Sequence, residues 1–142
     1  MNKTLPLIKD VAGLAKFMKS SSKSFDLVLD KLQLVSFGNG KCVAELKVDE
    51  SHTNSMGRLH GSLSTTLVDT LSSFALMSKV EGPHVSVDIH MSYLKDATVG
   101  DEIVVEARVV KSGKKMAFLE VDIVDKASKE LLVKGSHTKF IL

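Results

Sequence analysis

The chain has little of several residue types, and each shortage argues against a class of structure or partner. Cys42 is the only cysteine in 142 residues, so no intrachain disulfide can form, and a reducing compartment is the simplest setting. There is no tryptophan, one tyrosine and no basic run interleaved with aromatic residues. With a net charge of only +2, the composition does not indicate a nucleic-acid partner. No stretch approaches the roughly 20 apolar residues of a bilayer-spanning helix, so stable membrane insertion is not expected.

Motifs for metal and serine chemistry are also missing. The five histidines form no H-E-x-x-H motif and no cluster with cysteine, so no metal site is expected. Ser64, Ser72 and Ser73 have no G-x-S-x-G setting, which argues against a serine nucleophile. No feature of the sequence requires a cofactor.

What is present is the length and patterning of one domain over residues 1–142, without repeats, low-complexity tracts or linker-like stretches. An amphipathic helix is expected at about residues 5–22, with an apolar face that includes Leu7, Leu14 and Met18. This N-terminus also loosely resembles a mitochondrial presequence, although it contains no arginine, so targeting stays open beside packing. The expected location is the cytoplasm, with mitochondrial association as the alternative.

The rest of the chain predicts short strands around one central helix. Residues 32–48 are expected to form a hairpin around Gly38-Asn39-Gly40, and a helix is expected over 61–78. Four strands should follow in hairpin succession, at residues 85–93, 102–110, 116–124 and 131–141. Because strands and helices do not alternate, the expected class is α+β, an antiparallel sheet with one helix packed against it.

The central helix is the most informative segment. Its 18 residues from Gly61 to Ser78 contain one charged residue, Asp69, in a chain that is 25% charged. The apolar arc of the helix should face the core, and it consists of Leu63, Leu67, Val68, Leu71, Phe74, Ala75 and Met77. The opposite arc carries small Ser and Thr side chains around Asp69, which predicts that it too is covered, by sheet edges or by a second subunit. Asp69 should then be partly desolvated, and is either held by neighbouring hydroxyls or functional.

The residues that precede this helix favour acyl transfer. Gly61 would begin the helix with a free backbone N–H at the positive end of the helix dipole, which suits a developing oxyanion. Because Gly61 lacks a Cβ, a substrate carbonyl can approach its backbone closely. This donor, together with Asp69 and the polar side chains of Asn54 and His60, suits acyl transfer.

The spacing of Gly61 and Asp69 favours a site shared by two chains. The two positions are eight residues apart, which is about 12 Å along a helix axis. One substrate carbonyl therefore cannot touch both within one chain. Two such helices lying antiparallel about a two-fold axis would bring Gly61 of one chain near Asp69 of the other. A homodimer with shared active sites is expected.

Several segments resemble the hotdog-fold acyl-CoA thioesterases: "HTNSMGRLHGSLSTTLVD" (52–69), "VSVDIHMSYLKDATVGD" (85–101), "AFLEVDI" and the ending "GSHTKF". The similarity is greatest to the branch that contains phenylacetyl-CoA thioesterase and thioesterase superfamily member two. The resemblance implies a hotdog fold, in which the antiparallel sheet wraps around one long helix, and dimers that commonly form homotetramers. It also implies a role in lipid metabolism, the hydrolysis of fatty or aryl acyl-CoA to free acid and coenzyme A.

The resemblance also implies roles for individual residues. Asp69 would be the general base that activates water or, alternatively, a nucleophile. The Gly61 amide would polarise the thioester carbonyl, and Asn54 would help to hold that carbonyl or the water. His60 would support the loop and lie near the sulfur, and Ser86 would orient the carboxylate or the water.

Basic residues near the end of the chain offer cations for the coenzyme A phosphates, although a solvated hairpin tip is the simpler interpretation of each lysine. The candidates are Lys111, Lys114, Lys115, Arg108, His137 and Lys139. A non-catalytic acyl-CoA- or lipid-binding regulator on the same fold stays open as a second function, and a hotdog dehydratase is a weaker third. The combination of Asp69, Asn54 and Gly61 favours the thioesterase, because a pure binder has no use for that carboxylate.

Overall fold

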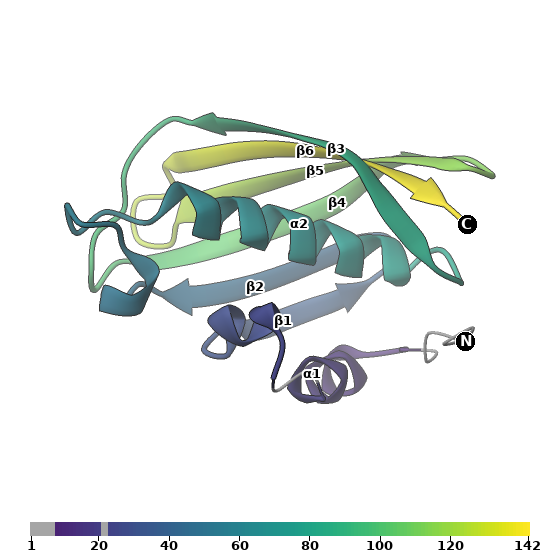
Figure 1. Cartoon of the computed structure of the whole chain (residues 1–142), viewed down its shortest axis with the longest axis horizontal. Helices are drawn as coiled ribbons and strands as arrows, with labels where there is room; N and C mark the ends of the chain where they lie inside the picture. The colour runs from purple at the N-terminus through teal and green to yellow at the C-terminus, as the bar shows by residue number, and fades with distance from the viewer. Residues whose placement is uncertain (1–7, 21–22) are drawn as a thin grey trace.

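The computed structural model describes residues 8–20 and 23–142, and its elements follow the predicted order of helix, two strands, helix and four strands (Figure 1). Their bounds are α1 Val11–Lys19, β1 Gln33–Gly38, β2 Lys41–Lys47, α2 Gly61–Met77, β3 His84–Tyr93, β4 Glu102–Ser112, β5 Met116–Asp125 and β6 Leu131–Ile141. Two short 3₁₀ helices, which were not predicted, cover Phe25–Leu29 and Glu50–His52. Among the described helices, none is long and apolar enough to cross a membrane.

Helix α1 is shorter than the predicted span of residues 5–22. It begins after Asp10, whose carboxylate accepts a hydrogen bond from the N–H of Gly13 at 2.8 Å and so caps the first turn. Leu14 is fully buried, so the helix packs against the rest of the fold. Residues 5–7 and 21–22 lie outside the described part of the chain, and the outer ends of the predicted helix are therefore untested.

All six strands form one antiparallel sheet in the order β1-β2-β4-β5-β6-β3, which confirms the predicted α+β class. The hairpins β1–β2, β4–β5 and β5–β6 are as expected. The exception is β3, which pairs with β6, whereas β4 pairs with β2. An alternating sequence indicates which side chains face the core, but the same pattern fits several neighbours, so it did not reveal this crossover.

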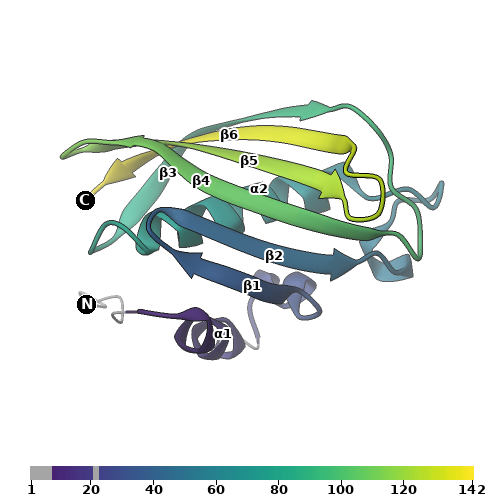
Figure 2. The same cartoon turned by 180° about the vertical axis from the view of Figure 1, so that it is seen from behind.

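Helix α2 lies across the concave face of the sheet, with α1 beside β1 (Figures 1 and 2). The predicted apolar arc is confirmed: its residues are buried except for Met77, which is partly exposed. Gly135 on β6 permits the close approach of α2, because a Cβ at that position would lie 2.7 Å from Cγ1 of Val68. A sheet wrapped around one long helix is the hotdog arrangement that the resemblance implied.

Strand β3 departs from the strict alternation of its sequence. Its pairing with β6 shifts between Ser86 and Asp88, which leaves Val87 in a bulge. Val85 and Val87 are exposed, whereas Ile89 is half-buried against the core. Because β3 is also an edge of the sheet, it presents an unpaired backbone edge together with exposed apolar side chains. Natural proteins usually cover or pair such an edge.

Candidate functional site

The loop before α2 holds two of the predicted site residues. The side-chain oxygen of Asn54 accepts hydrogen bonds from the N–H groups of Met56 at 2.9 Å and Arg58 at 3.2 Å, so its amide NH₂ group remains as the donor end. His60 is the N-cap of α2, and its Nδ1 accepts a hydrogen bond from the N–H of Ser62 at 3.1 Å. With Nδ1 as acceptor, the proton of the neutral ring lies on Nε2.

Gly61 begins α2 as predicted, so its N–H belongs to the first turn, where no carbonyl four residues earlier can accept it. Its carbonyl oxygen accepts hydrogen bonds from the hydroxyls of Thr65 at 3.1 Å and Tyr93 at 3.2 Å. These contacts tie the first peptide group of α2 to β3 and fix its orientation. The positive end of the helix, with His60 as its N-cap, suits an oxygen that gains negative charge.

Asp69 lies in the middle of α2, and its side chain is exposed in the single chain. The expected desolvation is therefore wrong for one chain alone. The sheet wraps the apolar arc of the helix, and along the opposite arc it fully buries only Ser72. In the described part of the chain, Asp69 is thus left exposed on this face of α2.

His137 connects Ser86 to the helical turn of Asp69. It is 1% exposed, and its Nδ1 and Nε2 lie 2.7 Å from the hydroxyl oxygens of Ser72 and Ser86 respectively. The Ser72 hydroxyl donates to the backbone carbonyl of Asp69 at 3.2 Å. Because the Ser72 hydrogen is already donated to Asp69, the hydrogen bonds of this series can run in one direction only. Ser86 donates to Nε2 of His137, and Nδ1–H of His137 donates to Ser72. This direction leaves the Ser86 oxygen able to accept a hydrogen bond from a further group.

The same contacts overturn the assignment of His137 to a coenzyme A phosphate. Burial, followed by the charge of Lys139, lowers the pKa of His137 to about 4 against the opposing attraction of Asp88, so the ring is neutral at pH 7. A neutral ring with both nitrogens hydrogen-bonded cannot serve as a cation for phosphate. The sequence contained a usable signal, because His137 lies two and four residues after the inward-facing Gly135 and Val133.

The other predicted cations divide into two groups. Lys111, Lys114 and Lys115 are exposed on the β4–β5 hairpin. Arg108 instead donates to carboxylates of β5, to Glu120 at 2.6 Å and Asp122 at 3.2 Å. Its charge is already matched, which argues against the predicted phosphate role.

Lys139 was also predicted to be a surface cation for a coenzyme A phosphate, but the structure buries it. It is 5% exposed, and its Nζ donates to Oγ of Ser73 on α2 at 2.7 Å. It follows His137 on the inner face of β6, and it faces the same pocket as Asp69.

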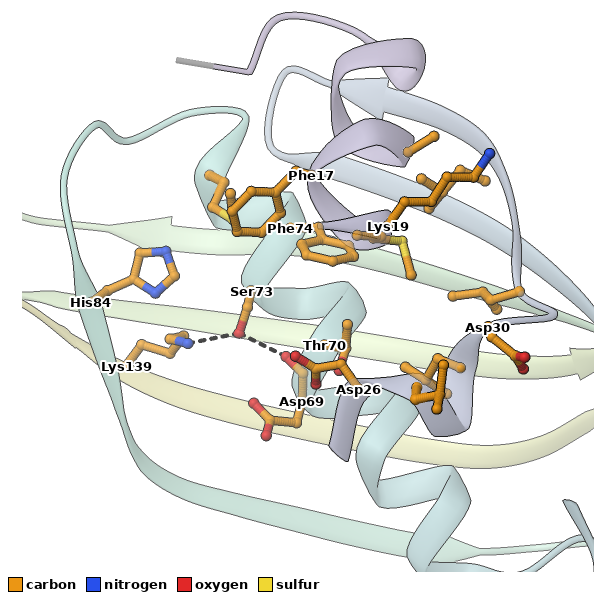
Figure 3. Close-up of a pocket in the computed structure, with 17 residues that line it drawn as sticks. Phe17, Lys19, Asp26, Asp30, Asp69, Thr70, Ser73, Phe74, His84 and Lys139 are labelled. Carbon is orange, nitrogen blue, oxygen red and sulfur yellow. Dashed lines mark hydrogen bonds between the residues drawn. The ribbon is translucent and has the colours of Figure 1, made fainter. Parts of the chain in front are cut away.

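That pocket has a volume of about 530 Å³ and lies between α2 and the N-terminal segment (Figure 3). Its polar end contains Asp69, Ser73, His84 and Lys139. Much of the remaining wall is apolar and includes Phe17, Met18, Leu29, Leu34, Phe74 and Met77. A cavity of this size and composition suits a ligand with a hydrocarbon body. The contribution of α1 to this wall could not be read from the periodicity of the helix.

Comparison with known proteins adds an independent observation. The family model described as the thioesterase superfamily matches residues 56–132. Human acyl-coenzyme A thioesterase 13 is 45% identical over 123 residues, which cover 86% of this chain and 88% of that protein. The mouse protein of the same name is 47% identical over 118 residues, which cover 82% and 84%.

The fold agrees with these sequence similarities. The crystal structure of thioesterase superfamily member 2 from zebra fish has a TM-score of 0.88 at 38% identity, and covers 98% of this chain and 100% of that chain. The mouse structure of thioesterase superfamily member 2 has a TM-score of 0.84 at 44% identity, and covers 91% and 95%. Sequence and fold therefore point to the same group of proteins.

Proposed function

Since the chain belongs to the thioesterase superfamily, we propose that it hydrolyses fatty or aryl acyl-CoA to the free acid and coenzyme A, with Asp69 as the catalytic carboxylate. The similarity to acyl-coenzyme A thioesterase 13 over most of the chain supports the acyl-CoA thioesterase activity. The observation that carries the assignment of Asp69 is its place at the polar end of a largely apolar pocket, on a helix whose first turn offers a backbone donor.

In this mechanism, the Asp69 carboxylate takes a proton from a water molecule as the water attacks the thioester carbonyl carbon. The Gly61 N–H and the Asn54 amide donate to the carbonyl oxygen, which becomes negative in the transition state. Collapse of the tetrahedral intermediate breaks the C–S bond beside His60. The departing thiolate takes up the proton that Asp69 removed from water, which releases coenzyme A and restores the carboxylate. Because the Ser86 hydroxyl proton is directed at His137, the Ser86 oxygen can accept from the attacking water. The alternative is attack by Asp69 itself, which forms a mixed anhydride that water then hydrolyses.

We infer that each site is built from two chains of a homodimer. Gly61 and Asp69 are about 12 Å apart along α2, which prevents one carbonyl from reaching both in a single chain. The exposed apolar side chains of the β3 edge, Val85, Val87 and Tyr93, support pairing along that edge. In an antiparallel pair, Asp69 of one chain would approach Gly61, Asn54 and His60 of the other.

The three exposed lysines of the β4–β5 hairpin fit this arrangement. The hairpin lies at the end of the molecule where α2 ends (Figure 1). In an antiparallel pair this end is close to the first turn of the partner's α2. Lys111, Lys114 and Lys115 would then hold coenzyme A phosphates beside a thioester bound at the partner's Gly61.

We also infer that the dimers pair into a homotetramer and that the protein acts in lipid metabolism in the cytoplasm, with mitochondrial association as the alternative location. The resemblance supports the tetramer, and the single cysteine agrees with a reducing compartment. Sedimentation analysis of the purified protein distinguishes the dimer from the tetramer, and fractionation of expressing cells distinguishes the two locations.

The activity is tested by incubating purified protein with short, medium, long and aryl acyl-CoAs and detecting free coenzyme A with a thiol reagent. Asp69→Asn preserves size but removes the base, so kcat should fall by about 10²–10⁴-fold. Asp26→Asn is the matched control, because Asp26 lines the same pocket and should be dispensable. If Asp69→Asn keeps more than about a tenth of wild-type kcat, the assignment of Asp69 is wrong. If no acyl-CoA is hydrolysed by the wild type, the non-catalytic lipid-binding alternative replaces this proposal.

A further inference from the structure

Lys139 is a buried cation without a carboxylate partner. Its side chain is 5% exposed and its Nζ donates to the Ser73 hydroxyl, but no carboxylate oxygen lies within 4.0 Å among residues 8–20 and 23–142. Burial lowers the pKa of Lys139, and the attraction of Asp69 offsets this effect only in part. Because removing an ammonium group from water is costly, an anion bound beside Lys139 would stabilise it.

His84 lies at the same end of the pocket as Lys139 (Figure 3), and what its ring lacks is a hydrogen-bond partner in the described part of the chain. Both of its ring nitrogens are shielded from solvent, and neither has a hydrogen-bond partner in the described part of the chain. Burial, followed by the positive charge of Lys139 and by repulsion from His137 once that ring is protonated, lowers the pKa of His84 to about 4. At pH 7 the ring is therefore neutral and carries one unpaired N–H donor, which a rotation of the ring would direct at a ligand in the pocket.

The rest of the pocket sets a second requirement. Phe17 and Met18 of α1 and Phe74 and Met77 of α2 line the cavity of about 530 Å³. Lys19 and Asp30 lie at the end opposite to Lys139 (Figure 3). An inorganic anion would leave the apolar walls unused, and a neutral hydrocarbon would leave Lys139 uncompensated. The two requirements are met together by a ligand with one anionic head and a hydrocarbon body.

We propose that this pocket binds free aliphatic carboxylic acids, with the carboxylate at Lys139 and His84 and the hydrocarbon tail between α1 and α2. The thioesterase reaction would form such an acid beside Asp69, so the origin of the ligand rests on the proposed function, whereas its binding does not. Asp69 repels the carboxylate of the acid, and Lys139 supplies the opposite charge that retains it. The released acid is thus a competitive inhibitor of hydrolysis.

The test is calorimetric titration of the full chain with sodium dodecanoate and with 1-dodecanol, which has the same tail and no charge. Lys139→Gln removes the proposed anchor, and Lys19→Gln is the matched control because it removes the same charge at the opposite end of the pocket. Dodecanoate should bind about 10- to 100-fold more weakly to Lys139→Gln than to the wild type, the usual loss of a charge-assisted hydrogen bond. Dodecanoate should bind Lys19→Gln as tightly as it binds the wild type. The affinity of 1-dodecanol should be the same for the wild type and both variants.

Several outcomes would overturn the proposal. One is that dodecanoate binds Lys139→Gln as tightly as the wild type; another is that the wild type binds no dodecanoate. If Lys139→Gln fails to fold, the wild type alone decides, because equal affinities for dodecanoate and 1-dodecanol would contradict an anionic subsite.

Failure of this inference is distinguishable from failure of the proposed function. Asp69→Asn should bind dodecanoate at least as tightly as the wild type, because one repelling carboxylate is gone. If acyl-CoA is not hydrolysed but dodecanoate binding depends on Lys139, the proposed function fails and this inference stands. If acyl-CoA is hydrolysed and the affinity for dodecanoate is the same with and without Lys139, only this inference fails.

Discussion

Replacing Gly61 by proline removes the backbone N–H that is proposed to hold the thioester oxygen, while it leaves the start of α2 almost unchanged. Proline is favoured at the first helical position, because its fixed φ suits the helix and the missing N–H has no acceptor there. His60 already has φ −66° and ψ 129°, which is the conformation of a residue before proline. Gly61→Ala is the matched control, since it retains the N–H. Its Cβ would contact the Tyr93 ring at an ordinary 3.4 Å.

The expected magnitude follows from the loss of one donor to an oxyanion, which typically costs about 10²–10³-fold in kcat. We expect Gly61→Pro to lose this much in kcat while its helical content and urea midpoint stay near those of the wild type. Gly61→Ala should remain within about tenfold of the wild type, because only the approach of the substrate becomes tighter. The assay is steady-state release of coenzyme A, with circular dichroism as the folding control. If Gly61→Pro is as active as Gly61→Ala, the Gly61 N–H does not polarise the carbonyl.

Two further predictions concern stability. The pKa of His137 is about 4 in the folded chain against the ordinary 6.5, so the unfolded state takes up the proton first as the pH falls. The free energy of unfolding should therefore drop between pH 6.5 and 4, by at most about 3 kcal/mol from this residue. Urea titrations at several pH values should show a smaller drop for His137→Asn. If the free energy of unfolding falls equally with pH in both proteins, the buried neutral ring is contradicted. In Gly135→Ala the new Cβ would lie 2.7 Å from Val68, so we expect a loss of about 1–3 kcal/mol that adding Val68→Ala partly relieves. Strictly additive losses would show that the two residues do not clash.

The scaffold around the site was predictable because it depends on local patterns. The apolar arc of α2 repeats with helical period, and its residues pack onto the sheet as that period requires. The glycine-rich turn at Gly38-Asn39-Gly40 likewise encodes the β1–β2 hairpin, where all three residues have positive φ. The bulge at Val87 depends on pairing with β6, a strand that begins more than forty residues later, so local alternation could not reveal it.

The site itself was less predictable, because its electrostatics depend on burial. His137 and Lys139 were assigned to a charged surface by residue type alone, whereas their spacings of two and four residues from Gly135 place them on the inner face of β6. Asp69 was expected to be desolvated, but within residues 8–20 and 23–142 it is left exposed. The covering surface is proposed to belong to a second subunit, which the pattern of one chain does not locate.

The measurement that tests the shared site most directly uses two inactive variants, Asp69→Ala and Asn54→Ala. They are unfolded together and refolded as an equimolar mixture, and subunit exchange is verified by pulling down one tagged variant with the other. Random pairing makes about half of the dimers mixed, and in a two-fold symmetric mixed dimer both lesions fall in one site while the other site is intact.

The shared site predicts recovery of about a quarter of wild-type activity, because half of the dimers have one good site of two. Each variant refolded alone should remain inactive. If every site lies within one chain, each site of every dimer keeps a lesion. An exchanged mixture without recovered activity would therefore contradict the shared site.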